Sequence, residues 1–222
     1  CQKVGITHVY SVPLFWDSLA LSVTRKFAMQ SEDKQKLLEK MITYNLKEIE
    51  FKDAGLAANP IVNDKVKKML LGNKVKYCIS GGGYLSNETL RTINGLGYPL
   101  YNGYGMTEIG VTSVELSQDV KKRLLAQIGL PLHAVAYKIN ENNELLVKSP
   151  TIHIREIIAG VEKETILDDG YFHTGDIVSE GDNGYLIKGR MKDVIINANG
   201  ENIFPDELEM YFRSLPLITN LS

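Results

Sequence analysis

The sequence lacks three features that would place a protein in a special class: an excess of one charge, paired cysteines and a long apolar run. Its 25 Lys and Arg residues face 27 Asp and Glu residues, so a net charge of −2 gives no positive field to attract nucleic acid. The two cysteines, Cys1 and Cys78, form neither a CxxC pair nor a metal-spaced cluster, which favours a reducing, cytoplasmic setting. No apolar run approaches the roughly 20 residues that cross a bilayer, and no signal-peptide pattern opens the chain. We therefore expect neither nucleic acid as a partner nor a transmembrane segment.

The remaining composition is that of an ordinary globular protein. Hydrophobic residues make up 44% and charged residues 23% of the 222 positions, which is enough to bury a core and leaves room for more than one compact unit. The four histidines show no metal-ligand spacing, so a zinc enzyme is not indicated: His8, His133, His153 and His173.

The first half of the chain has an α/β pattern. An extended segment spans 7–12, and apolar residues between Leu37 and Ile49 recur at helical spacing after a capping Ser31. A second helix is predicted over 64–71, with Val66, Met69 and Leu70 facing inward and Gly72 ending it. A strand over 75–79, a helix from Ser86 to about Gly95 and a strand over 98–101 then indicate a parallel α/β layer.

From about Gln127 onward the pattern is mostly β. A turn over 140–143 separates two short extended segments, and turn residues punctuate the rest. The predicted strands span 135–139, 144–147, 171–178, 184–189 and 194–197, and a final helix is predicted over 205–212.

Two glycine-rich segments follow predicted strands, where ligands of open α/β sheets lie. The first, Ser80-Gly81-Gly82-Gly83-Tyr84, would let a flat ring approach the backbone, although a plain tight turn is the alternative and the GxxxxGK spacing of a phosphate loop is missing. The second is Asn102-Gly103-Tyr104-Gly105-Met106-Thr107-Glu108, where an aromatic ring, a hydroxyl and a carboxylate could serve a base, a phosphate and Mg²⁺. A β-turn between strands is its alternative interpretation.

Two later side chains could bind a sugar. Asp176, in His173-Thr174-Gly175-Asp176, could accept hydrogen bonds from both ribose hydroxyls, and Arg190 could add donors. Each taken alone could equally be a surface residue.

Together these segments resemble four ordered signatures of the adenylate-forming superfamily of acyl-CoA synthetases, luciferases and peptide-synthetase adenylation domains. They are Ser80 to Leu85, Asn102 to Glu108, Thr174-Gly175-Asp176 and Gly189-Arg190-Met191-Lys192-Asp193, and the match runs from about Val75 to Glu209. One departure is that Gly83 and Tyr84 stand where alanine and proline are common. The resemblance implies the α/β portion of the large AMP-binding domain over 1–126, a small β-rich subdomain over 127–191 and the start of the small C-terminal domain over 192–222.

The resemblance also implies the roles of individual residues. The nucleotide-binding set would comprise Gly82 and Gly83 lining the adenine, Tyr104 stacking on it, its neighbours Asn102, Gly103 and Gly105, Thr107 on the phosphate, and Asp176 and Arg190 on the ribose. Thr107 and Glu108 would be the catalytic residues, Glu108 would hold Mg²⁺, and Lys192 would be the hinge between the domains.

The chemistry implied is attack of a carboxylate on the α-phosphorus of ATP, which gives acyl-AMP and pyrophosphate, followed by acyl transfer to CoA. The segment Asn199 to Glu209 resembles the loop near the hinge of acyl-CoA ligases, and the ten positions from Arg190 to Gly200 favour a long-chain fatty-acid ligase. Two alternatives stay open: an adenylation domain that loads a carrier protein, and a non-catalytic nucleotide-binding or interaction module.

Two parts of the family's machinery have no counterpart in this sequence. No segment matches the Ser/Thr/Gly-rich phosphate loop that ends in lysine, and Lys192 is the last lysine, so the catalytic lysine of the small domain is missing too. The chain also begins with Cys1, almost directly before a strand. We therefore expect a fragment of a longer enzyme that does not make acyl-AMP by itself.

Overall fold

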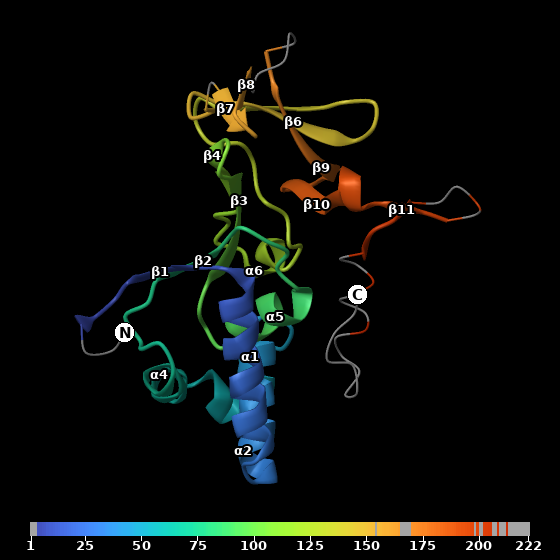
Figure 1. Cartoon of the computed structure of the whole chain (residues 1–222). Helices are drawn as coiled ribbons and strands as arrows, with labels where there is room; N and C mark the ends of the chain where they lie inside the picture. Colours follow the sequence, from blue (N-terminus) through green and yellow to red (C-terminus); the bar gives the residue numbers. More distant parts are fainter. Residues whose placement is uncertain are drawn as a thin grey trace. The chain divides into compact units, whose positions relative to one another are not determined.

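The chain divides into two compact units in a computed structural model, shown in Figure 1. The structure describes residues 4–153, 155–164, 170–197, 199, 202–205, 208 and 212. The first unit is formed by Cys1–Gly103 and Glu115–Ala126, and the second by Tyr104–Val114 and Gln127–Ser222.

The first unit contains the predicted parallel α/β layer. Strand β2 (Tyr77–Ser80) pairs in parallel with both β1 (His8–Ser11) and β3 (Leu100–Met106), and helix α5 (Asn87–Gly95) connects β2 to β3. The helix predicted from Ser86 begins at Asn87, and Ser86 caps it, because its hydroxyl accepts the backbone N–H of Thr89 at 3.1 Å. The other helices of this unit are α1 (Pro13–Ala28), α2 (Glu32–Asn45), α3 (Phe51–Ala54), the 3-10 helix η2 (Gly55–Ala58), α4 (Pro60–Met69) and α6 (Val120–Arg123).

Helix α1 was not anticipated from the sequence. It begins with Pro13, whose fixed φ suits the first helical position, and it buries Trp16, Ala20 and Val23 at spacings of four and three. Figure 1 shows α1 running beside α2, and the two helices are in contact. Trp16 therefore lies on the buried face of a helix, while its apolar neighbours Leu14 and Phe15 are exposed.

The helices predicted between Leu37 and Ile49 and over 64–71 both form, but their ends differ from the prediction. Ser31 precedes α2, but its side chain makes no capping hydrogen bond, and α2 ends at Asn45, before Ile49. Helix α4 starts earlier than predicted, at Pro60, because the side chain of Asn59 caps it by accepting the N–H of Ile61. The inward-facing role of Met69 was wrong, since 76% of that residue is exposed.

The second glycine-rich segment is a strand rather than a turn. Strand β3 continues through Met106, and the turn comes only at residues 107–109, before β4 (Gly110–Val114). Gly105 allows this close pairing, because a Cβ there would overlap the carbonyl oxygen of Gly110 and lie 2.8 Å from the Cα of Val111. The turn signal read from the glycines was therefore a signal for close approach between two strands.

The second unit is mostly β, as predicted. An antiparallel sheet has the order β10-β9-β6-β5, and its core joins residues from β6 and β9 to Tyr104 and Ile109. Its elements are β5 (Ala136–Ile139), β6 (Glu144–Lys148), β9 (Phe172–Gly181) and β10 (Gly184–Arg190), the hairpin of β7 (Arg155–Ile158) with β8 (Val161–Glu164), the 3-10 helix η3 (Met191–Asp193), and the pair β11 (Ile195–Ile196) with β12 (Asn202–Ile203).

The β7–β8 hairpin was not predicted, and the predicted final helix over 205–212 lies largely outside the described residues. Within the part of the chain that the structure describes, no helix is long and apolar enough to span a membrane.

Candidate functional site

A buried carboxylate on β9 is the centre of the site in the second unit. Asp176 is only 4% exposed, and the hydroxyl of Tyr104 donates to its Oδ2 at 2.6 Å. The guanidinium Nε of Arg190 lies 3.1 Å from its Oδ1, with nearly half of the Arg190 side chain exposed. Three of the predicted nucleotide-binding residues therefore meet through one carboxylate.

Sheet register explains how Arg190 reaches Asp176. Strands β9 and β10 are antiparallel, and Arg190 is the direct partner of Asp176 across the pair. Opposite residues in such a pair are close enough for their side chains to interact. The short connection at residues 182–183 thus brings two distant sequence signatures to one point.

The two acidic groups of this cluster have shifted pKa values. Burial raises the pKa of Asp176, and the charge of Glu144 adds to this, while the Tyr104 hydrogen bond and the Arg190 charge oppose it. Burial, with Asp176 beside it, also holds the pKa of Tyr104 well above its usual range, so its phenol stays a donor at neutral pH. The carboxylate has two partners and keeps acceptor capacity for further donors, such as sugar hydroxyls.

The first glycine-rich segment lies in the first unit, after β2. Gly82 has a φ of +79°, and a Cβ built on it would meet nothing within 4 Å, so the backbone there is open to a ligand. Gly83 is also exposed, while a Cβ on Gly81 would lie 3.4 Å from the carbonyl oxygen of Gly103. The side chain of Asn102 donates to the carbonyl of Ala126 at 2.8 Å, which is a scaffold contact within the unit.

Thr107 and Glu108 occupy the turn between β3 and β4. Thr107 is exposed and Glu108 is half-buried. The N–H of His153 donates to the backbone carbonyl of Glu108 at 3.0 Å, so the turn is tied to a neighbouring segment of the same unit. Among the residues that the structure describes, no group of three or more His, Cys, Asp or Glu is placed to hold a metal ion. Glu108 could still serve Mg²⁺, which usually takes one or two carboxylates and completes its shell with phosphate and water.

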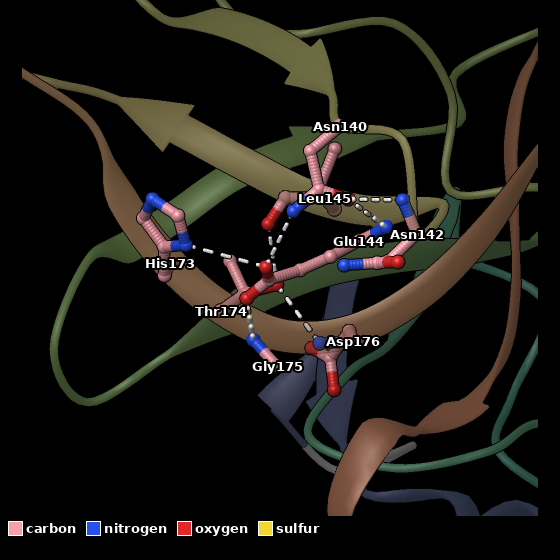
Figure 2. Close-up of polar contacts among 8 residues, drawn as sticks. All are labelled: Asn140, Asn142, Glu144, Leu145, His173, Thr174, Gly175 and Asp176. Atoms are coloured by element: carbon pink, nitrogen blue, oxygen red, sulfur yellow. Dashed lines mark hydrogen bonds and ion pairs between the residues drawn. The ribbon is translucent and has the colours of Figure 1, made fainter. Parts of the chain in front are cut away.

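Reasoning from sequence missed the residues that support Asp176. Figure 2 shows Glu144, Asn140 and Thr174 in a hydrogen-bonded group around the part of β9 that contains Asp176. Glu144 is 6% exposed. Its one signal in the sequence is its position directly before the apolar run 145–147, where an acidic side chain has no evident partner. Lys192, the predicted hinge, is exposed in η3.

Comparison with known proteins gives concordant matches. The family model described as "AMP-binding enzyme" matches residues 1–152. A long-chain-fatty-acid–CoA ligase of Mycobacterium bovis, FadD15, is 32% identical over 154 residues, covering 67% of this chain and 25% of the relative. A 2-succinylbenzoate–CoA ligase of Staphylococcus epidermidis is 36% identical over 135 residues, covering 58% of this chain and 28% of the relative.

A solved structure shows the same fold. The o-succinylbenzoate CoA synthetase MenE of Bacillus subtilis, in complex with its acyl-adenylate intermediate, matches with a TM-score of 0.63 at 21% identity. The match covers 97% of this chain and 37% of the MenE chain. The chain thus spans roughly a quarter of the length of the two curated relatives named above.

Proposed function

This chain belongs to the family of AMP-binding enzymes, and from that premise we propose that it is part of an ATP-dependent ligase that joins a carboxylic acid to coenzyme A. The overall reaction has two steps. The carboxylate displaces pyrophosphate from ATP to give acyl-AMP, and the thiol of CoA then takes the acyl group and releases AMP. The observation that carries the proposal is the buried Asp176 carboxylate, held between the Tyr104 hydroxyl and Arg190.

In this proposal the residues of the second unit bind the sugar and phosphate. Asp176 accepts hydrogen bonds from the ribose hydroxyls, and half-exposed Arg190 adds donors at the same edge. The Tyr104 hydroxyl fixes the carboxylate, and the residue, which is 9% exposed, stacks its ring on the adenine through that exposed part. Thr107 donates to phosphate, and Glu108 holds Mg²⁺, which supplies charge neutralisation at the phosphates when bound. The backbone at Gly82, in the first unit, is open, as its predicted role requires.

A fatty acid is our first choice of substrate. The relative from Mycobacterium bovis is a long-chain-fatty-acid–CoA ligase, and the spacing from Arg190 to Gly200 favours the same class. The relative from Staphylococcus epidermidis supports an aromatic dicarboxylic acid as the second candidate. We place the enzyme in a reducing, cytoplasmic setting.

Nucleotide binding by the 222-residue chain tests the proposal. AMP should bind to the chain. Asp176→Ala should weaken this binding about ten- to a hundredfold, because the ribose hydroxyls lose their charge-assisted hydrogen bonds to the carboxylate. Asp182→Ala makes the same change of charge at an exposed position of the β9–β10 turn and should leave binding unchanged. Equal affinities of the two variants would exclude Asp176 from the site.

Turnover distinguishes the remaining possibilities. We expect the isolated chain to release no pyrophosphate from ATP with fatty acids or o-succinylbenzoate, because it has neither a phosphate loop nor the catalytic lysine. The longer parent protein should do so with one of these acids, and transfer to CoA rather than to a carrier protein should complete the cycle. A parent that binds AMP and activates no acid would support a non-catalytic module instead.

A further inference from the structure

Glu144 is a buried carboxylate that the proposed chemistry does not use. It opens β6, is 6% exposed, and lies in the second unit beside the part of β9 that contains Asp176. A carboxylate removed from water is costly unless hydrogen bonds compensate for the lost solvent. The partners of Glu144 therefore indicate what its burial achieves.

Both carboxylate oxygens of Glu144 are engaged, as Figure 2 shows. The backbone N–H of Gly175 donates to Oε1 at 3.0 Å. The Nδ2 amide of Asn140 donates to Oε2 at 2.8 Å, and Nδ1 of His173 lies 3.2 Å from the same oxygen. One of these contacts reaches the residue directly before Asp176.

The orientation of Asn140 is fixed by other bonds. Its Oδ1 accepts the N–H groups of Asn142 at 2.9 Å and of Glu144 at 3.0 Å. The Nδ2 group must then face the Glu144 carboxylate, and reversing the amide would break both of those bonds. The turn over 140–143 therefore presents an amide donor to the Glu144 carboxylate.

The ladder between β6 and β9 is irregular where Asp176 lies. Leu146 pairs with His173 and Glu144 with Ile177, so the segment 174–176 stands opposite Leu145 alone. Such a bulge gives up regular ladder hydrogen bonds and re-aims the side chains in it. Gly175 takes a φ of +71°, which an L side chain rarely adopts.

Side chains replace the lost ladder bonds in this bulge. The hydroxyl of Thr174 donates to the carbonyl of Leu145 at 2.7 Å and accepts the N–H of Asp176 at 3.0 Å. Glu144 supplies the acceptor for Gly175. The backbone on both sides of the Gly175–Asp176 peptide is thus held by side chains.

We propose that Glu144 is a positioning residue for the ribose site, holding the 174–176 bulge so that the Asp176 carboxylate meets Tyr104, Arg190 and the sugar hydroxyls. The proposal rests on the proposed role of Asp176 in binding ribose. Its ligand is the ribose of an adenine nucleotide, and Glu144 acts on that ligand only through Asp176.

A pair of nucleotides separates positioning from general stability. AMP carries the two ribose hydroxyls, and 2′,3′-dideoxy-AMP lacks both. The wild-type chain should prefer AMP by about ten- to a hundredfold, because charge-assisted bonds to Asp176 depend on the hydroxyls. Glu144→Ala should lower this preference for AMP at least tenfold, so that a wild-type preference of about tenfold would disappear. The affinity for 2′,3′-dideoxy-AMP should stay nearly unchanged. Glu141→Ala, an exposed charge in the same turn, should keep the wild-type ratio.

A rescue by complementary substitutions tests the hydrogen-bond arrangement itself. Glu144→Gln keeps an acceptor for Gly175, but it sets its own amide donors against those of Asn140, so the ratio should fall. Adding Asn140→Asp places an acceptor opposite the new donors at unchanged net charge, and the ratio should recover. The rate of hydrogen exchange at the Gly175 amide should rise in Glu144→Gln and return to the wild-type rate in the double variant, whether or not nucleotide is present.

The outcomes are distinguishable. If the wild-type chain binds no AMP, or does not prefer it over 2′,3′-dideoxy-AMP, the proposed role of Asp176 fails, and amide exchange at Gly175 still decides whether Glu144 holds the bulge. If the wild type discriminates and Glu144→Ala discriminates equally well, the positioning role is overturned. Equal loss of both ligands, or no rescue by the double variant, also overturns it, because Glu144 would then support only the fold.

Discussion

Removing the hydroxyl of Tyr104 should destabilise the chain by an amount that depends on pH. The phenol donates to the buried Oδ2 of Asp176 at 2.6 Å, and this bond lowers the pKa of Asp176 against the effect of burial. Tyr104→Phe keeps the ring and deletes the donor. A hydrogen bond to a charged group contributes about 1.5–3 kcal/mol, so we expect a loss of that size at pH 7.

The sign of the pH dependence follows from the pKa of Asp176. Without the Tyr104 donor, the native-state pKa rises further above the ordinary 3.8, so stability is lost as the pH rises through a higher native pKa. Well below pH 3.8 the carboxyl is mostly protonated in the unfolded state as well, and only a neutral hydrogen bond is missing, worth about 0.5–1.5 kcal/mol. The difference between wild type and variant should therefore grow from pH 4 to pH 7.

Scanning calorimetry at several pH values provides the assay, with Tyr137→Phe as the matched control. The hydroxyl of Tyr137 lies 2.6 Å from the hydroxyl of Thr112, a neutral partner in the same unit. For a chain of this size, 1.5–3 kcal/mol lowers the Tm by about 3–12 °C, whereas the control should lose less and show no pH dependence. A constant difference across pH, or equal losses in the two variants, would refute the reasoning.

Three further predictions concern single residues. Gly105→Ala should cost at least about 3 kcal/mol of stability, because the added Cβ meets rigid backbone of β4. Gly82→Ala places its Cβ in open space and should cost only about 1–2 kcal/mol, because of the φ of +79° at that position. Urea unfolding compares the two variants, and similar costs would contradict the close approach of β4 to Gly105. Cys78 should resist thiol reagents at pH 8, because burial raises its pKa to about 12 and leaves a thiolate fraction on the order of 10⁻⁴. Mass spectrometry should find Cys78 labelled only as fast as the chain unfolds, and rapid labelling of the folded chain would contradict its burial. Asp176→Asn should remove a loss of stability that the wild type shows as pH rises above the ordinary Asp value of 3.8, because the native Asp176 pKa is raised; parallel pH profiles of the two proteins would show that another group is responsible.

The parallel layer and the β-rich region could be predicted because periodicity and turn residues report local structure directly. The strands at β2, β5, β6, β9 and β10 lie within a few residues of their predicted bounds. Helix α1 was missed because its apolar stretch follows a strand without a turn signal, and only the burial of Trp16, Ala20 and Val23 shows its period. The glycines of 102–105 were taken as a turn because sequence cannot distinguish a glycine needed for φ from one needed for close strand contact.

The site was only partly accessible from sequence for a similar reason. Tyr104, Asp176 and Arg190 were found through signatures, and the structure brings these three together. Glu144 and Asn140 were missed, because their importance lies in hydrogen bonds across a sheet whose register no local pattern encodes. The roles of Thr107, Glu108 and Lys192 stay predictions.

The bulge at residues 174–176 also bears on which sequence changes β9 can accept. Successive side chains of a strand point to opposite faces, so removing or adding one residue between His173 and Ile177 would reverse the face on which every following residue of the strand lies. The β9–β10 hairpin would keep its own register, which sets Asp176 opposite Arg190, but it would pair with β6 one residue out of register. Relatives that keep the Glu144–Gly175 hydrogen bond beside Asp176 should therefore differ here by substitution and not by length, and alignment gaps should fall in the loops that flank β9.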